Sequence, residues 1–213
     1  ESNARDGVII VWHQGDTYFA DGVFARKLVD PETAWPALPD TFEDAWGEVA
    51  VYDPEPSLYI CRLEAVSDGA GGVIVSWMDA RTGDMRLYAQ RIDRDGNVLW
   101  PEGGVALNGP QTDTGCNWAM RLHAAADDNG GVVVVCSNAT QRTVRAQLVS
   151  ADGMPLWLDG GVLVAEDIGV YSDIVPQGVV SASDGSWAIT SPRLTNCGRL
   201  TPSRASLGLT TRT

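Results

Sequence analysis

An internal repeat constrains the fold of this chain more strongly than any other feature. The stretch "GGVIVSWMDARTGDMRLYAQRIDRDGNVLW" (71–100) returns as "GGVVVVCSNATQRTVRAQLVSADGMPLW" (130–157). Trp100 and Trp157 are 57 residues apart, whereas Trp35 and Trp100 are 65 residues apart. The differences in length fall in loops, where repeat scaffolds tolerate insertions. Self-similarity at such a spacing indicates that each copy is one supersecondary unit.

Each unit predicts four short strands. In the middle copy these are "SLYICRLEAVS", the β-branched run "VIVSW", "RLYAQRID", and a last strand from "VLW" through "GGVAL". Turns rich in Asp and Gly separate them, and no segment has a helical period. Four antiparallel strands repeated every 40 to 60 residues or so are typical of a β-propeller blade. We therefore expect an all-β chain, a β-propeller fragment of about three four-stranded antiparallel blades of about 57–65 residues each.

The middle copy resembles a known repeat, GGxxVxWxDxR…YAQRxDxDGxxLWxxGGV, of large secreted or cell-surface bacterial proteins with predicted β-propeller domains. The resemblance covers roughly residues 3–185. It implies a scaffold outside the cytoplasm, either secreted or on the cell surface, and it carries over no catalytic residue. In the third copy Asp79 becomes Asn138, Arg81 becomes Thr140 and Arg91 becomes Leu148, which departs from the pattern. The residues of the middle copy that match it are Asp79, Arg81, Tyr88, Ala89, Gln90, Arg91, Asp93, Gly96, Trp100, Gly104 and Val105.

The repeat divides the chain into units. Residues 1–57 are a partial first blade with an inserted loop at 36–57, 58–110 the second blade, 111–168 the third, and 169–191 the start of a fourth. Each blade is expected to place a tryptophan (Trp35, Trp100 or Trp157) in the gap to its neighbour. Because both ends of the chain are ragged, we expect a fragment of a longer propeller whose remaining blades are its partners.

The C-terminal segment differs in composition. After Asp184 the chain has four arginines and no acidic residue, and the repeat disappears. A linker is one interpretation, and a frame-shifted or artificial end is the other. The second is favoured, because linkers rarely begin inside a strand. Residues 192–213 are predicted to be a disordered, non-repeat tail.

Charge and hydropathy exclude some function classes. The formal net charge is −13, so the chain should repel nucleic acid. No stretch approaches 18 consecutive apolar residues, and we therefore expect no membrane insertion.

The cysteines do not form a known framework. Cys61, Cys116, Cys136 and Cys197 include no CxxC and no zinc spacing. Structural thiols are favoured, with a single disulfide as the alternative. Cys136 replaces Trp77 in the repeat, which predicts a buried apolar position.

Four residues are weak candidates for binding. Arg62 and Arg121 occupy equivalent positions in the first strand of their blades, the strand that lines the channel of a propeller. They could bind a carboxylate or sulfate, or pair with loop carboxylates of the neighbouring blade, and the second is favoured. Glu64 and His123 share one repeat position but differ in charge.

Catalytic, metal and cofactor signals are weak. "DRDGN" (93–97) lacks the glycine and the closing glutamate of a calcium loop, so we predict a hairpin turn and no metal. No GxSxG, P-loop, HExxH or GxGxxG motif occurs, and no cofactor or catalytic residue is predicted. The favoured hypothesis is a non-catalytic repeat scaffold or binding module that contacts a glycan or cell-surface protein. The alternative is a glycan hydrolase or lyase whose catalytic groups lie partly outside this fragment.

Overall fold

The computed structural model describes residues 7–15, 20–28, 48–54, 59–107, 121–127, 129–138, 143–157, 160–165, 178–181, 186–190 and 199–200. Every regular element in these ranges is a β-strand, which confirms the predicted all-β class. Within the same ranges no helix could cross a membrane.

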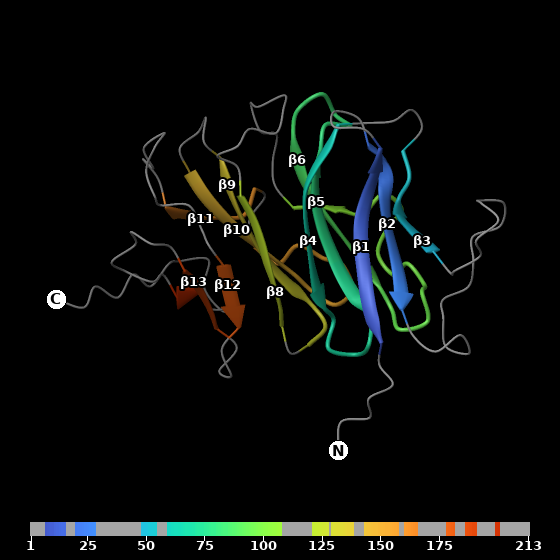
Figure 1. Cartoon of the computed structure of the whole chain (residues 1–213). Helices are drawn as coiled ribbons and strands as arrows, with labels where there is room; N and C mark the ends of the chain where they lie inside the picture. The colour runs from blue at the N-terminus through green and yellow to red at the C-terminus, as the bar shows by residue number, and fades with distance from the viewer. Residues whose placement is uncertain are drawn as a thin grey trace, which may run out of the picture.

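The strands form four antiparallel sheets, each built from strands that are consecutive in sequence (Figure 1). The first sheet contains β1 (Val8–Gly15), β2 (Ala20–Leu28) and β3 (Glu48–Tyr52), and the second contains β4 (Ile60–Ser67), β5 (Val73–Asp79), β6 (Arg86–Ile92) and β7 (Val105–Ala106). The third contains β8 (Arg121–Ala126), β9 (Val132–Asn138), β10 (Thr143–Val149) and β11 (Val162–Ala165), and the fourth contains β12 (Gly178–Ser181), β13 (Trp187–Thr190) and β14 (Arg199–Leu200).

Neighbouring sheets pack against each other and create three apolar cores. One core joins the first and second sheets, the next joins the second and third, and the last joins the third and fourth. All seven residues of β5 are buried, because sheets cover both of its faces. This explains why "VIVSW" does not alternate between apolar and polar residues, and it confirms the propeller-type, blade-by-blade fold that the repeat predicted.

Part of the predicted inserted loop at 36–57 is a strand. In β3, Val49 is paired with Ala25, as Val105 is paired with Ala89 and Val162 with Ala146 in the next two sheets. The segment "GEVAVY" is therefore the counterpart of "GGVALN", and the loop prediction is wrong for residues 48–52. Glu48 occupies the position of the second glycine of the repeat, so the sequence of this segment does not show its similarity to "GGVALN".

The predicted disordered tail is wrong at two residues. Leu200 and Arg199 in β14 are paired with Trp187 and Ala188 in β13, so the fourth sheet extends beyond residue 191. The other residues of the 192–213 segment lie outside the described ranges.

Tryptophans occupy the gaps between sheets, as predicted. Trp100 is 4% exposed, and its Nε1–H donates at 2.9 Å to the carbonyl of Ala151, in the turn that follows β10 of the third sheet. Trp157 meets Trp187 of the fourth sheet edge to face, with 6.2 Å between ring centroids. Trp35 lies outside the described residues.

The cysteines divide into two environments. Cys61 is in a disulfide, so the favoured prediction of structural thiols is wrong at this position, and its bonding partner lies outside the described residues. Cys136 is a buried thiol in β9, opposite Leu122, which confirms the predicted apolar position.

Replacing Gly153 with Ala should destabilise the protein more than replacing Gly69 with Ala. The two glycines have nearly equal φ values, 79° and 76°, so each alanine adds similar backbone strain of about 1–2 kcal/mol. A Cβ at position 153 would also lie 2.8 Å from the Trp100 ring, whereas a Cβ at position 69 meets no atom within 4 Å. Urea denaturation should show a further loss of about 1–3 kcal/mol for Gly153→Ala. Equal losses would contradict the packing of Trp100 against the third sheet.

Candidate functional site

The first strands of the last three sheets are neighbours in space. β4, β8 and β12 are edge strands of their sheets, and β8 contacts both β4 and β12 (Figure 1). We call these three strands the inner strands. All four predicted binding residues lie on them.

The inner strands bring the candidates onto two adjacent segments. Arg62 and Glu64 are on β4, and Arg121 and His123 are on β8. All four side chains are half-buried. They are also the only charged or imidazole-bearing residues within the three inner strands. The favoured pairing of the two arginines with loop carboxylates stays a prediction.

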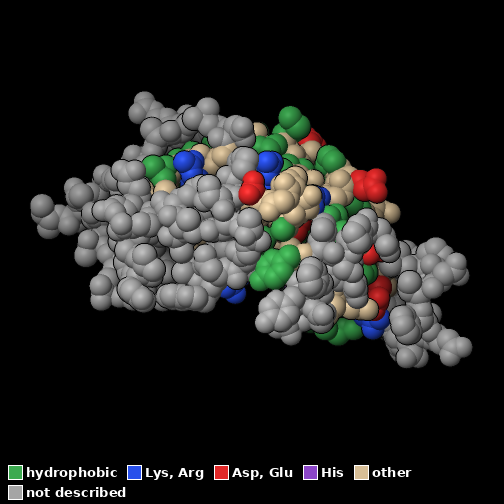
Figure 2. All heavy atoms as spheres, turned by 90° about the horizontal axis from the view of Figure 1, so that it is seen from above, with side chains coloured by type: hydrophobic (Ala, Val, Ile, Leu, Met, Phe, Trp, Pro, Cys, Tyr) green, Lys and Arg blue, Asp and Glu red, His purple; other side chains and the backbone are tan. Residues whose placement is uncertain are grey.

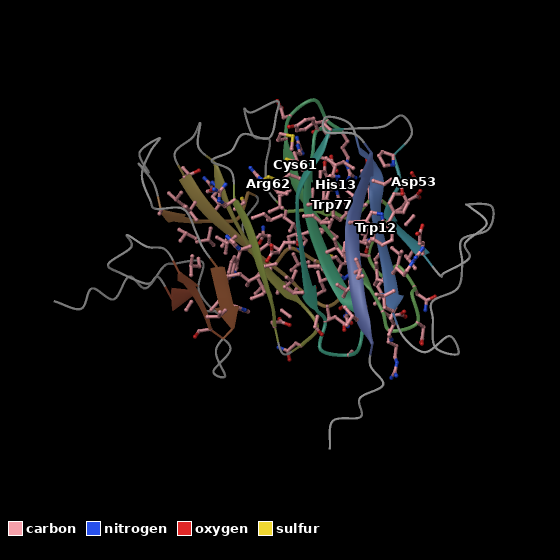
Figure 3. The ribbon with its side chains drawn as sticks, in the orientation of Figure 1. Trp12, His13, Asp53, Cys61, Arg62 and Trp77 are labelled. Carbon is pink, nitrogen blue, oxygen red and sulfur yellow. The ribbon has the colours of Figure 1, made fainter. Side chains whose placement is uncertain are left out.

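Arg62 has an unusual backbone. The pairing of β4 with β5 shifts between Cys61 and Leu63, so Arg62 is the extra residue of a β-bulge. Its φ is 51°, in the left-handed region that non-glycine residues rarely adopt. Figure 3 shows Arg62 beside Cys61 towards one end of β4. Arg121, at the same repeat position, instead pairs regularly with Ser137, whose hydroxyl accepts the Arg121 N–H at 2.9 Å.

Glu64 and His123 interact electrostatically. Burial raises the pKa of the Glu64 carboxyl, and the charge of His123 lowers it by a smaller amount, so the pKa stays above its ordinary value. Among the described residues, no second carboxylate contributes to this shift. Glycoside hydrolysis ordinarily uses two carboxyl groups, and the described part of the inner strands supplies one.

The motif residues Trp77, Asp79 and Arg81 form an internal polar cluster. The fully buried Asp79 carboxylate accepts a hydrogen bond from Trp77 Nε1 at 2.9 Å. Arg81 Nε donates to Asp79 Oδ1 at 2.9 Å, and an Arg81 terminal nitrogen donates to the Gly103 carbonyl at 2.7 Å. We call these three residues the Arg81 cluster. Its polar groups are directed at one another and at the backbone.

Two tyrosine rings enclose the Arg81 guanidinium. Its central carbon lies 3.8 Å from the Tyr52 ring centroid and 3.7 Å from that of Tyr88. Tyr52 ends β3 in the first sheet, whereas Tyr88 is in β6 of the second. Arg81 therefore links the first and second sheets through its cation–π contacts, whereas its ion pair with Asp79 lies within the second sheet.

Gln90 connects the third strand of its sheet to the tryptophan corner. Its side-chain oxygen accepts from the Trp100 N–H at 2.9 Å, and its Nε2 donates to the Pro101 carbonyl at 2.9 Å. Gln147 repeats the first contact in the third sheet, where it accepts from the Trp157 N–H at 3.1 Å. The glutamine of the repeat thus holds the chain where it turns towards the fourth strand.

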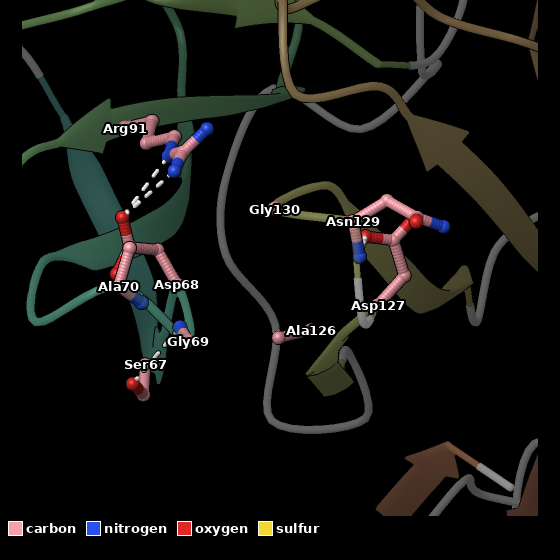
Figure 4. A pocket seen from close by; sticks show the side chains of 9 residues that line it. All are labelled: Ser67, Asp68, Gly69, Ala70, Arg91, Ala126, Asp127, Asn129 and Gly130. Atoms are coloured by element: carbon pink, nitrogen blue, oxygen red, sulfur yellow. Dashed lines mark hydrogen bonds and ion pairs between the residues drawn. The ribbon is translucent and has the colours of Figure 1, made fainter. Parts of the chain in front are cut away.

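A cleft that sequence reasoning missed lies between two turns of adjacent sheets (Figure 4). It has a volume of about 560 Å³ and is bordered by Asp68 and Arg91 on one side and by Asp127 and Asn129 on the other. An ion pair joins Asp68 to Arg91, with 2.9 Å between the carboxylate oxygen and the guanidinium nitrogen. In the third copy, Asp127 takes the place of Asp68 and Leu148 takes the place of Arg91. Burial raises the pKa of Asp68, but hydrogen bonds from backbone N–H groups and from Arg91 outweigh it and leave the pKa below its ordinary value.

On the face that Figure 2 shows, the charged side chains of the described residues do not form a single patch. In Figure 2, acidic and basic side chains of the described residues are interspersed on the visible face. Among the described residues no group of three or more His, Cys, Asp or Glu side chains could hold a metal ion.

Comparisons with known proteins assign no family. No family model matches the chain, and no curated protein matches it. Among solved structures, it is similar to a protein of unknown function from Bacteroides caccae, with 12% identity and a TM-score of 0.38 over 93% of this chain and 55% of that one. It is also similar to a chain of a nidogen/laminin complex, with 11% identity and a TM-score of 0.26 over 93% of this chain and 75% of that one. The chain thus spans about half the length of the first structure.

Replacing Arg81 with Thr, the residue of the third copy, should destabilise the protein by about 3 kcal/mol, because Asp79 would become a buried charge without its cation. The double variant Asp79→Asn/Arg81→Thr reproduces Asn138 and Thr140 of the third copy. It should lose less free energy of unfolding than the single variant, since no charge is buried. Urea denaturation of both variants checks this, and a double variant less stable than the single one would contradict the buried-charge explanation.

Replacing Glu64 with Gln should raise Tm at pH 7.5 and leave it nearly unchanged at pH 4. A raised folded-state pKa favours the protonated carboxyl, so this group's contribution to stability is present below the ordinary glutamate pKa of about 4.3. That contribution is lost as the pH rises through the folded-state pKa, because the carboxyl ionises. Glutamine cannot ionise, so the Glu64→Gln variant keeps its stability at the higher pH. Thermal melts at the two pH values measure the effect. A lower Tm at pH 7.5 would show that the Glu64 carboxylate stabilises the fold.

Proposed function

We propose that this chain is a non-catalytic repeat scaffold or binding module of a secreted bacterial protein. One observation supports the scaffold role most directly, which is that the polar motif residues are used inside the fold. Asp79, Arg81 and Gln90 bond to neighbouring side chains or to the backbone of their own sheet. These three motif residues thus hold their own sheet in shape, which supports a scaffold role over chemistry on a substrate.

Two arguments support a location outside the cytoplasm. The repeat resembles those of secreted or cell-surface bacterial proteins, and Cys61 is in a disulfide. Disulfides persist in oxidising compartments and are rare in the cytosol. The proposed location is secreted or on the cell surface.

The proposed partners are a glycan or a cell-surface protein, together with further blades of a longer parent chain. The net charge of −13 disfavours nucleic acid. Residues with the chemistry to contact a ligand lie on the inner strands, where Arg62, Arg121, Glu64 and His123 are half-buried.

The second candidate function is a propeller enzyme acting on glycans, a hydrolase or lyase, with part of its catalytic groups elsewhere. The raised pKa of Glu64 beside His123 is the specific observation in its favour. A carboxyl with a raised pKa is suited to general acid catalysis near neutral pH.

Binding without turnover is the expected result for this chain. A glycan array would measure binding, while reducing-end release and the absorbance of unsaturated products would measure hydrolysis and elimination on the glycans that bind. The Glu64→Gln/His123→Gln variant sets the background for both reactions. Turnover by the natural chain above that background would overturn the non-catalytic proposal and favour the enzyme. If no glycan binds and no reaction is detected, the scaffold role remains and the glycan-binding role is wrong.

A further inference from the structure

The first sheet exposes an apolar face. Ile9 and Val11 of β1 pack against the core that the first sheet shares with the second. Side chains alternate along a strand, so Val8 and Ile10 lie on the opposite face, together with Leu28 of β2, which is paired with Val8. Val8 is 63% exposed, Ile10 45% and Leu28 48%. We call this side of the first sheet the outer face. Contiguous apolar surface of this kind is typical of a protein–protein interface.

The counterparts of these residues are buried in the next two sheets. In the second sheet the residues at the same register positions are Val73, Val75 and Ile92. They are 5%, 0% and 0% exposed, because the first sheet covers them. In the third sheet the residues at these positions are Val132, Val134 and Val149, all 0% exposed where the second sheet covers them. The outer face is therefore the surface on which a preceding sheet packs in this fold.

An aromatic pair on the outer face repeats a pair that is used between sheets. Trp12 and Phe24 are cross-strand partners with 6.1 Å between their ring centroids, and both are half-buried. Their counterparts in the second sheet, Trp77 and Tyr88, stack in the same way. Tyr52 of the preceding sheet stacks on Trp77, with 5.7 Å between the ring centroids. The outer face thus keeps the aromatic arrangement that receives a preceding sheet.

The fourth sheet of the chain does not cover the outer face. The sheets follow one another in a row, with the first and the fourth at opposite ends (Figure 1). Val179 and Ile189 pack the fourth sheet against the third, so Val180 lies on the other side of the fourth sheet, where it is 55% exposed. Among the described residues, the first sheet thus lacks a preceding sheet and the fourth lacks a following one.

We propose that a second copy of this chain covers the outer face, with the fourth sheet of each copy packed on the first sheet of the other. A single added sheet would cover the outer face but expose its own, whereas a second copy covers both end sheets of both chains. Two copies with four sheets each make a ring of eight, within the range of about four to eight blades in closed propellers. The inference adds a partner to the proposed function and does not depend on its ligand. The competing occupant is a further blade of a longer parent chain.

Sedimentation velocity of the oxidised full chain, from sub-micromolar to several hundred micromolar, measures the association. The mass should rise with concentration from that of one chain to that of two. Ile10→Lys puts a charge where an isoleucine would be buried and should raise the Kd of the pair about tenfold or more. Val180→Lys, on the other side of the contact, should weaken the pair to a similar degree.

His13→Lys is the matched control, because it changes an exposed residue of the same strand on the opposite face. It should leave the Kd as in the natural chain. Ile10 and Val180 are exposed in the single chain, so neither lysine should change the Tm measured where the natural chain is a monomer. The two variants lie in different sheets and test the contact independently.

Four results would overturn the inference. If the chain has the mass of one copy at every concentration, the second copy is wrong and the parent-chain blade remains as the occupant. If Ile10→Lys weakens the pair no more than His13→Lys does, another surface holds it. If Val180→Lys has no effect while Ile10→Lys does, two first sheets pack on each other. If the mass grows beyond two chains, the contact is head to tail but does not close. Glycan binding and turnover are measured separately, so none of these results decides the proposed function.

Discussion

The packing of one sheet face against the next is the constraint on which the rest of this structure depends. The Arg81 cluster shows how it is met between the first two sheets, where a guanidinium paired with a buried carboxylate lies between Tyr52 and Tyr88. Further along, Trp100 reaches the Ala151 carbonyl of the third sheet. Each sheet is too small to bury both faces alone, so these contacts turn successive hairpins into one body.

Variation between the copies becomes interpretable in these terms. The third copy replaces Asp79 and Arg81 together, by Asn138 and Thr140, so neither charge is left without the other. It keeps the glutamine that holds the tryptophan corner, where Gln147 accepts from the Trp157 N–H. A replacement that removes a single charged partner would bury the remaining charge, which is the costlier arrangement.

The candidate binding residues, in contrast, differ between copies or depart from regular geometry. Arg62 and Arg121 occupy one repeat position, yet only Arg62 is in a bulge with a positive φ. Glu64 and His123 occupy another and lie near enough for the charge of one to shift the pKa of the other. The scaffold places these side chains on adjacent strands, and their chemistry is not dictated by the repeat.

The sequence by itself determined the all-β class, the order of strands within a blade, the burial of β5 and the inter-sheet role of Trp100, because these follow from periodicity and from spacings along the chain. Only the tertiary structure decided that residues 48–52 are a strand. Glu48 replaces the second glycine of the repeat motif, and the pairing of this segment with β2 is a long-range contact. The bulge at Arg62, the disulfide at Cys61 and the nearness of Glu64 to His123 likewise depend on how separate strands meet. A local pattern specifies which face a residue occupies, but not which residue of another strand will lie beside it.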